Sequence, residues 1–256
     1  MEYHVLRANP AGNITLFVLD PVPSGDRAGL AARLMAGSDI EQVGFVCPSL
    51  LGSDGRLEMA GGEFCGNAAR AFGMLVSQSR GDLPQVRVEI SGCSSPVTVD
   101  VDWSGHAARA GMPLPREVTR LQADGRPGTL VDLTGIAHLV VEGIPPSLEF
   151  FQRVEPLLQS VPDLEAYGVI FLNQDNLIPL VKVPSAGTLV WEGSCGSGSL
   201  AAAIAQSRNV PDGPFVRTYL QPAGSIQVTL ACQNGEAVSA CIGGPVALDP
   251  PVVVRL

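Results

Sequence analysis

The sequence predicts an α+β protein built from two pseudo-symmetric domains. Three observations lead to this fold class: a pattern that repeats after about 130 residues, short runs rich in β-branched residues, and alanine-rich segments without proline. Repetition on this scale indicates a duplicated structural unit, and the mixture of segments indicates strands and helices in each unit. With 256 residues, of which 46% are apolar, each half is long enough to bury a core.

The repeat centres on two Cys-Gly motifs. Residues 64–69 (Phe-Cys-Gly-Asn-Ala-Ala) correspond to residues 194–199 (Ser-Cys-Gly-Ser-Gly-Ser), an offset of 194 − 64 = 130. Three further matches follow in the same order in both halves: residues 78–80 with 206–208, 86–87 with 216–217, and 97–99 with 228–230. We therefore expect one domain over residues 1–113 and another over residues 114–256. A cleft between such domains is a common place for a ligand site.

Strands are expected where apolar, β-branched runs are bounded by Gly, Pro, Asn or Ser. In chain order these runs are residues 14–19, 86–90, 97–101, 139–141, 168–172 and 226–230. Helices are expected where alanine is frequent and apolar residues recur at helical spacing, over residues 27–36, 67–79 and 198–207. The last two helices directly follow the Cys-Gly pairs, and Asn67 and Ser197 are suited to cap them.

The composition excludes several classes of function. Asp and Glu outnumber Lys and Arg by 25 to 16, and the formal net charge is −9, so neither nucleic acid nor an anionic membrane is expected as a partner. No run approaches the roughly 18 apolar residues of a membrane helix, and residues 1–10 lack the pattern of a secretory signal. Six cysteines are too few for a disulfide scaffold, which favours a cytoplasmic protein with reduced thiols.

The sequence lacks a metal-binding motif and has only one lysine that could hold a pyridoxal cofactor. There is no Cys-x-x-Cys motif, and His4, His106 and His138 are scattered, so no metal site is expected. Lys182 is the only lysine, and it lies in residues 178–183, which are predicted to form a buried strand. Because pyridoxal phosphate needs a lysine for its Schiff base, we expect an enzyme that uses no cofactor.

A cysteine at the start of a helix is suited to acid–base chemistry. The unpaired N–H groups and the dipole at a helix N-terminus favour an anion, which promotes the thiolate of a group whose ordinary pKa is about 8.5. Two such sulfurs on opposite sides of one carbon would remove a proton from one face and return a proton to the other. The helix starts would also stabilise the α-carboxylate of an amino acid. Cys65 and Cys195 therefore indicate racemisation or epimerisation of an α-amino acid.

The other four cysteines are interpreted as buried core residues, the usual place for a thiol in an apolar chain. They are Cys47, Cys93, Cys232 and Cys241. Cys93 aligns with Ala223 in the repeat, so its thiol is dispensable there.

Residues 63–68 (Glu-Phe-Cys-Gly-Asn-Ala) and 194–198 (Ser-Cys-Gly-Ser-Gly) resemble the two active-site motifs of the diaminopimelate epimerase family of cofactor-independent amino-acid racemases. The resemblance covers the whole chain and includes five further stretches: residues 9–13, 41–45, 91–94, 191–195 and 221–226. It implies that each half is a barrel-like sheet around a central helix, with the active site in the cleft between the halves. It also implies that Cys65 and Cys195 are the base and the acid.

The resemblance implies roles for residues near the cysteines. Backbone N–H groups just after each cysteine would hold the α-carboxylate: those of Gly66, Asn67, Gly196 and Ser197. Asn13 would help to bind the amino-acid head group, and Glu192 would accept a hydrogen bond from the α-ammonium. From the residues alone, a turn position for Asn13 and a solvated loop position for Glu192 stay open.

Departures from the family pattern argue against diaminopimelate, whose distal amino-acid end needs several polar partners. The loop over residues 191–194 has no arginine, and Ile136 stands where the epimerase has an asparagine. An apolar side chain leaves a buried charge unpaired, which is costly. Within the family the pattern most resembles the histidine racemases of staphylopine-type metallophore biosynthesis. Glu41 and Gln42 offer groups that would hold an imidazole ring, although a surface loop is an equal alternative.

We therefore expect an isomerase that converts L-histidine to D-histidine for opine metallophore synthesis, with a small-molecule amino acid as its partner. The alternatives are diaminopimelate epimerase, a broad-specificity amino-acid racemase, and an enzyme of another class in the wider superfamily that isomerises or dehydrates its substrate. A non-enzymatic amino-acid-binding protein would need no reactive sulfur, so the matched cysteines count against it. His138 is open to a structural or a substrate-contacting role. A homodimer is compatible with the sequence, which does not fix the oligomeric state.

Overall fold

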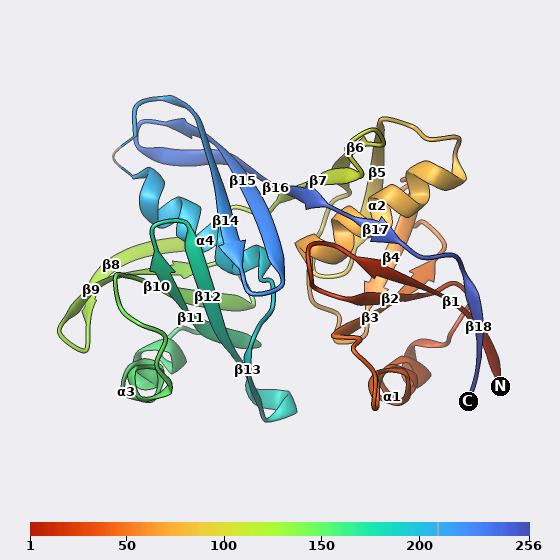
Figure 1. The fold of residues 1–256 in the computed structure, drawn as a ribbon, viewed down its shortest axis with the longest axis horizontal. Coiled ribbons are helices and arrows are strands. Elements are labelled where there is room, and N and C mark those ends of the chain that lie inside the picture. The colour runs from red at the N-terminus through yellow and green to blue at the C-terminus, as the bar shows by residue number, and fades with distance from the viewer. Residues whose placement is uncertain (209) are drawn as a thin grey trace. The chain divides into compact units, whose positions relative to one another are not determined.

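The computed structural model describes residues 1–208 and 210–256, which form two compact units (Figure 1). Unit 1 comprises Met1–Gly111 together with Gly243–Leu256, and unit 2 comprises Met112–Ile242. The first division lies close to the expected one between residues 113 and 114. The C-terminal segment differs from the expectation, because it belongs with unit 1 and not with the second half of the repeat.

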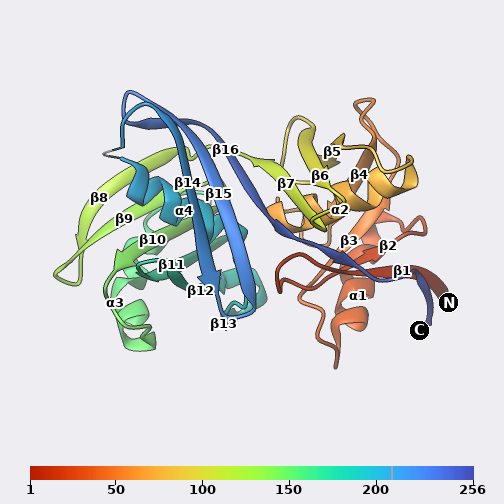
Figure 2. The ribbon, with the colours of Figure 1, turned by 45° about the horizontal axis from the view of Figure 1, so that its top comes forward.

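Strand pairing explains where the C-terminal segment lies. Strand β18 (Val252–Arg255) pairs antiparallel with β1 (Glu2–Asn9), and the Met1 amino group donates a hydrogen bond of 2.8 Å to the carbonyl oxygen of Leu256. Figures 1 and 2 both show the two chain ends side by side. The first and last strands therefore close unit 1 together.

Unit 1 contains two helices and most of its strands in the first 112 residues. Its elements are β1, β2 (Thr15–Val18), α1 (Ser24–Met35), β3 (Gln42–Cys47), β4 (Gly55–Met59), α2 (Gly66–Ser79), β5 (Gln85–Ile90), β6 (Val97–Asp102), β7 (Ala107–Met112), β17 (Ala247–Leu248) and β18.

Unit 2 has the remaining elements. They are β8 (Glu117–Ala123), β9 (Arg126–Asp132), β10 (Ile136–Glu142), α3 (Leu148–Gln159), β11 (Ala166–Asn173), β12 (Asn176–Val183), a 3₁₀ turn (Pro184–Ala186), β13 (Thr188–Trp191), α4 (Gly196–Ser207), β14 (Gly213–Gln221), β15 (Gly224–Gln233) and β16 (Glu236–Pro245), whose last residues enter unit 1.

Both units follow one topology. In unit 1, β1 and β2 are antiparallel, α1 crosses to β3 parallel to β2, β4 is antiparallel to β3, and α2 crosses to β5 parallel to β4. In unit 2 the same relations join β9, β10, α3, β11, β12, α4 and β14. The duplication inferred from the Cys-Gly repeat is therefore present in the strand pairing, and α2 and α4 occupy equivalent positions.

In unit 1 the first three strands lie between two helices, as Figure 1 shows. Side chains of a strand alternate between its faces, so Leu16 and Val18 pack with α1 whereas Phe17 packs against Phe72 of α2. All four residues of β2 are buried, as expected for a strand that is covered on both sides. The same alternation on β4 and β5 directs apolar residues to α2, which is buried along most of its length.

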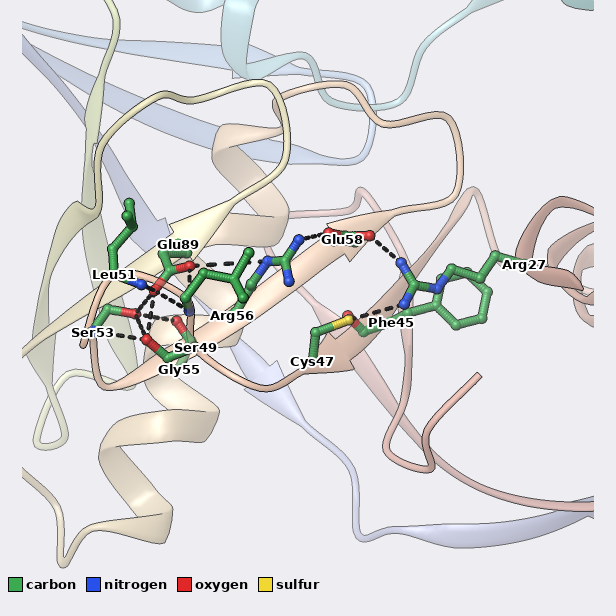
Figure 3. Close-up of polar contacts among 11 residues, drawn as sticks. Arg27, Phe45, Cys47, Ser49, Leu51, Ser53, Gly55, Arg56, Glu58 and Glu89 are labelled. Carbon is green, nitrogen blue, oxygen red and sulfur yellow. Dashed lines mark hydrogen bonds and ion pairs between the residues drawn. The ribbon is translucent and has the colours of Figure 1, made fainter. Parts of the chain in front are cut away.

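A polar network on the α1 side of β4 ties α1 to the sheet (Figure 3). The guanidinium of Arg27 pairs with Glu58 and lies 5.6 Å from the ring centroid of Phe45. Glu58 also pairs with Arg56. Next to it, buried Glu89 accepts hydrogen bonds from the hydroxyls of Ser49 and Ser53 and from two backbone N–H groups, which fixes the loop before β4.

Unit 2 repeats this layering with α3 and α4. On β10, Leu139 and Val141 pack with the α3 cluster, so the alternate residues, among them His138, face the other way, where α4 lies. The structure confirms all seven expected strands, residues 178–183 included, and the three expected helices, with ends shifted by at most three residues. Helix α3 was not expected from the sequence. It is capped by Ser147, whose hydroxyl accepts from the N–H of Phe150, and it contains Pro156.

Among the described residues, no helix is long and apolar enough to cross a membrane. All six cysteines are free thiols. Lys182 is only part-buried and pairs with Glu155 of α3, so the one lysine of the chain already has a carboxylate partner.

Candidate active site

Cys65 caps helix α2 with its sulfur. Its backbone is extended, with φ −126° and ψ 112°, and its Sγ accepts a hydrogen bond of 3.4 Å from the N–H of Ala68. The expectation that Asn67 caps this helix is wrong, because Asn67 lies inside the first turn, where its Oδ1 accepts from Arg70 at 2.9 Å. The sulfur takes the place that a serine or aspartate oxygen has in an ordinary cap.

An amide network surrounds the Cys65 sulfur. Gln42 Nε2 lies 3.3 Å from the sulfur, 2.8 Å from Asn13 Oδ1 and 2.8 Å from Thr15 Oγ1. Asn13 in turn donates from Nδ2 to Glu41 Oε2 at 2.7 Å. The structure thus brings together Asn13, Glu41, Gln42 and Cys65, which are 52 residues apart at most. Thr15 was not expected from the sequence.

Two opposing effects act on the Cys65 thiol. Burial raises its pKa, and the hydrogen bonds from Ala68 N–H, Gln42 and Asn67 N–H oppose that rise, whereas the negative charge of Glu63 adds to it. The net shift is upward. Burial likewise raises the pKa of the Glu41 carboxyl, against the hydrogen bond from Asn13.

Cys195 caps helix α4 in the same way. Its Sγ accepts a hydrogen bond of 3.3 Å from the N–H of Gly198, and the residue has φ −122° and ψ 111°. The expectation that Ser197 caps this helix is also wrong, because Ser197 lies two residues after Cys195, inside the first turn. Its hydroxyl is 3.5 Å from the sulfur and 2.9 Å from His138 Nε2. The two helix starts therefore share one geometry in separate units.

His138 is fully buried and neutral. Burial lowers the pKa of its imidazole to about 3, and its Nδ1 has no hydrogen-bond partner among the described residues. An unpaired N–H costs more than an unpaired lone pair, so we assign the proton to Nε2. With that assignment Nε2 donates to Ser197, whose own hydroxyl proton is free to donate to the Cys195 sulfur.

Gln221 fixes the backbone at the second cysteine. Its Oε1 accepts from the N–H of Cys195 at 2.7 Å, and its Nε2 donates to the hydroxyl of Ser199 at 2.9 Å. Gln221 begins one of the stretches that carry the family resemblance, but no spacing rule in the sequence indicates this contact. Its burial and its two hydrogen bonds show that it holds the loop rigid.

The Cys195 thiol is strongly biased toward its protonated form. Burial raises its pKa well above the ordinary value, and the carboxylate of Glu192, which interacts with the thiol, raises it further. The contacts from Ser197 and Gly198 N–H act in the opposite direction. Glu192 therefore lies beside the sulfur, as its closeness in sequence indicates.

Two concave regions of unit 2 contain none of the expected site residues. One, of about 550 Å³, runs along β14 and β15 and includes Cys232 and Cys241. The other, of about 460 Å³, lies beside Gln159 and Tyr167. The candidate site is therefore defined by the two capped helix starts and their polar surroundings.

The buried neutral imidazole predicts a pH-dependent loss of stability. In the unfolded chain His138 binds a proton near its ordinary pKa of 6.5, but in the folded protein only near pH 3. Unfolding therefore takes up a proton between these values, and the free energy of unfolding falls as the pH falls through this window. From pH 7 to pH 5 the loss due to His138 is about 2 kcal/mol.

Urea unfolding of the wild type and of His138→Gln at both pH values measures this loss. The variant is less stable at pH 7, but its own decrease between pH 7 and pH 5 is smaller than that of the wild type by about 2 kcal/mol. Equal decreases would contradict a neutral, buried His138.

The sequence of the chain is similar to those of known proteins. The chain is 30% identical to a histidine racemase of Fusobacterium nucleatum subsp. nucleatum (strain ATCC 25586), over 95% of this chain and 92% of that protein. It is 28% identical to a histidine racemase of Staphylococcus aureus (strain Mu50), over 86% of each chain.

Solved structures share the fold. A Bacillus anthracis phenazine biosynthesis protein of the PhzF family matches with a TM-score of 0.75 at 15% identity, and both chains are covered completely. A probable proline racemase from Agrobacterium radiobacter K84 matches with a TM-score of 0.64 at 14% identity, over 97% of this chain and 92% of that chain. The expected α+β class is confirmed, with a fold of the PhzF and proline racemase type.

The sequence profile of one family, described as the histidine racemase CntK N-terminal domain, matches residues 2–249. This range includes both cysteine-capped helices and nearly the whole chain, and the chain therefore belongs to that family.

Proposed function

We propose that the chain interconverts L- and D-histidine by a two-base reaction in which Cys65 and Cys195 act on opposite faces of the α-carbon. Membership in the family confirms the expected enzyme class, an amino-acid racemase among the isomerases. The observation that carries the mechanism is the cysteine cap: each unit sets one sulfur at the start of a buried helix, at the same position in the topology.

The proposed active site is built from the starts of α2 and α4, the central helix of the barrel-like sheet in each unit. The substrate carboxylate is held by backbone N–H groups of the first helical turns, which direct partial positive charge outward. These are the N–H groups of Gly66, Asn67, Gly196 and Ser197. As the α-proton leaves, negative charge spreads into this carboxylate, so the same contacts stabilise the transition state.

Proton transfer requires one thiolate and one thiol. Burial raises the pKa of both sulfurs, so the fraction of enzyme that carries one thiolate increases as the pH rises, and the activity increases with it. When one thiolate takes the α-proton, the thiol opposite donates its own proton to the carbanion, and the sulfurs exchange roles. The reverse direction uses the same groups, which a racemase requires.

Specificity for histidine is proposed to come from unit 1. The Glu41 carboxylate is hydrogen-bonded to Asn13, which also contacts Gln42 beside the Cys65 sulfur. A carboxylate that Asn13 links to the surroundings of the reacting thiol is suited to accept the N–H of an imidazole. Glu192, next to Cys195, is proposed to accept a hydrogen bond from the α-ammonium. The product would serve opine metallophore synthesis in the cytoplasm, where thiols stay reduced.

Exchange of either sulfur for oxygen tests the two-base reaction. Cys65→Ser and Cys195→Ser are each expected to lower kcat for histidine racemisation at least about a hundredfold, because a serine hydroxyl is far too weak an acid for this proton transfer. Polarimetry without added cofactor measures the rate. Cys93→Ser is the matched control, since Cys93 aligns with an alanine in the repeat and should leave the rate unchanged. Near-full activity of either active-site variant would exclude the mechanism.

Glu41→Ala tests the proposed imidazole contact. The variant should raise KM for L-histidine more than KM for an aliphatic amino acid, because only histidine loses a hydrogen bond. Deuterium uptake at the α-carbon, measured over a panel of L-amino acids that includes diaminopimelate, gives both values. Equal effects on all substrates would remove Glu41 from the specificity site, and a strong preference for diaminopimelate would overturn the substrate proposal.

A further inference from the structure

Arg70, in the second turn of α2, is fully buried. Its guanidinium donates to the carbonyl oxygen of Gly244 at 2.9 Å, to Asn67 Oδ1 at 2.9 Å, and more weakly to the carbonyl oxygens of Pro10 and Ala108. Its Nε has no hydrogen-bond partner within residues 1–208 and 210–256. Neutral oxygens thus hold the guanidinium in place without cancelling its charge.

No carboxylate pairs with Arg70 among the residues that the structure describes. The strands packed against α2 direct apolar side chains toward it: Leu57, Met59, Val86, Val88, Ile90, Val97, Val99 and Val101. The charged residues of β4 face the other side of the sheet, where Figure 3 shows Arg27 and Arg56 both paired with Glu58. The same unit therefore neutralises two part-buried arginines and leaves the buried one without a carboxylate.

Cys65 is the titratable group that interacts with this cation. Burial lowers the pKa of Arg70 to about 10, and the charge of Cys65 opposes that decrease, so Arg70 stays protonated at neutral pH. Electrostatic coupling between two groups is reciprocal, and the cation that a thiolate stabilises also stabilises the thiolate. Geometry links the two groups as well: Arg70 donates to Asn67 Oδ1, and the backbone N–H of Asn67 is hydrogen-bonded to the Cys65 sulfur.

The second unit lacks the equivalent cation. Cys65 aligns with Cys195 in the repeat, so Arg70, five residues later, aligns with Leu200, which is also fully buried. The charged group that acts on Cys195 is the anion of Glu192. Anions also lie near Cys65, namely Glu63 directly and Glu41 through Asn13, but only that cysteine has a buried cation in its own helix.

We propose that Arg70 is a positioning residue that supplies the buried countercharge for the Cys65 thiolate, so that Cys65 is the resting base and Cys195 the resting acid. The catalytic consequence is that the free enzyme is ready to deprotonate substrate from the Cys65 side. This consequence rests on the proposed function. The electrostatic effect itself concerns the protein without substrate. It is tested separately from racemisation.

The test compares Arg70→Gln with Arg70→Lys. Both variants lose the planar set of donors that holds Gly244, Pro10 and Asn67, but only lysine keeps the positive charge. In each protein, the rate of alkylation of Cys65 by iodoacetamide is followed from pH 6 to pH 10 by peptide mass spectrometry, which separates Cys65 from the other thiols. Thermal melting reports how much structure each variant retains.

We expect Arg70→Gln to slow alkylation of Cys65 at pH 7 at least about tenfold and to shift the pH midpoint upward, because one pKa unit changes the thiolate population tenfold. Arg70→Lys should restore the wild-type midpoint despite a similar loss of melting temperature. The acid limb of the kcat/KM profile for histidine should shift upward in the glutamine variant alone. Equal midpoints in all three proteins would overturn the proposal and leave Arg70 a structural residue.

The wild-type protein provides a second measurement that does not depend on the folding of any variant. The midpoint for Cys65 should lie below the midpoint for Cys195 in the same sample, because a midpoint depends on the pKa and not on accessibility. Coincident midpoints, or a lower one for Cys195, would refute the assignment of the resting base. If the alkylation results hold while racemisation is absent, the proposed function fails and the role of Arg70 stands.

Discussion

The hydrogen bond from a helical N–H group to a cysteine sulfur is the interaction on which each half of the candidate site depends. It fixes the sulfur at the first turn of α2 and of α4, and it does so with nearly identical backbone angles in both units. The helix favours the thiolate by only about 0.3–1 kcal/mol through its dipole. Burial outweighs that contribution, since the pKa of both thiols is raised. The cap therefore positions the sulfurs, and further charges must adjust their acidity.

The two units are duplicates in topology, but the groups that surround their sulfurs have diverged. The two units share the order of their strands and helices, but the groups around the sulfurs differ. Cys65 contacts the amides of Gln42 and Asn13, whereas Cys195 contacts the hydroxyl of Ser197, which is linked to a neutral imidazole. A symmetric fold thus presents two chemically unequal sulfurs. Such inequality is useful in a reaction that needs one base and one acid at any moment.

Sequence reasoning predicted the duplication and the strands because hydrophobic alternation and turn residues are local signals. It missed α3, whose interior Pro156 argues against a helix, since packing of Phe150 and Phe151 in the core outweighs that cost. It assigned the caps to Asn67 and Ser197 because a cysteine is rarely considered a cap. The burial of Arg70 could not be foreseen, since arginine is usually exposed and only the fold shows that no carboxylate accompanies it. The contacts of Gln221 and Thr15 likewise join residues distant in sequence.

The hydrogen isotope pattern of the first turnovers tests the two-base claim most directly. L-histidine is mixed with the enzyme in deuterated water, and the reaction is stopped before racemisation reaches equilibrium. The two enantiomers are then separated, and the deuterium content of each is measured by mass spectrometry. If separate sulfurs remove and return the proton, the D-histidine carries deuterium at its α-carbon while the remaining L-histidine keeps its original hydrogen, and the reverse holds from D-histidine. D-histidine that retains the hydrogen of the substrate would mean that one group performs both transfers, which would contradict a reaction shared by Cys65 and Cys195.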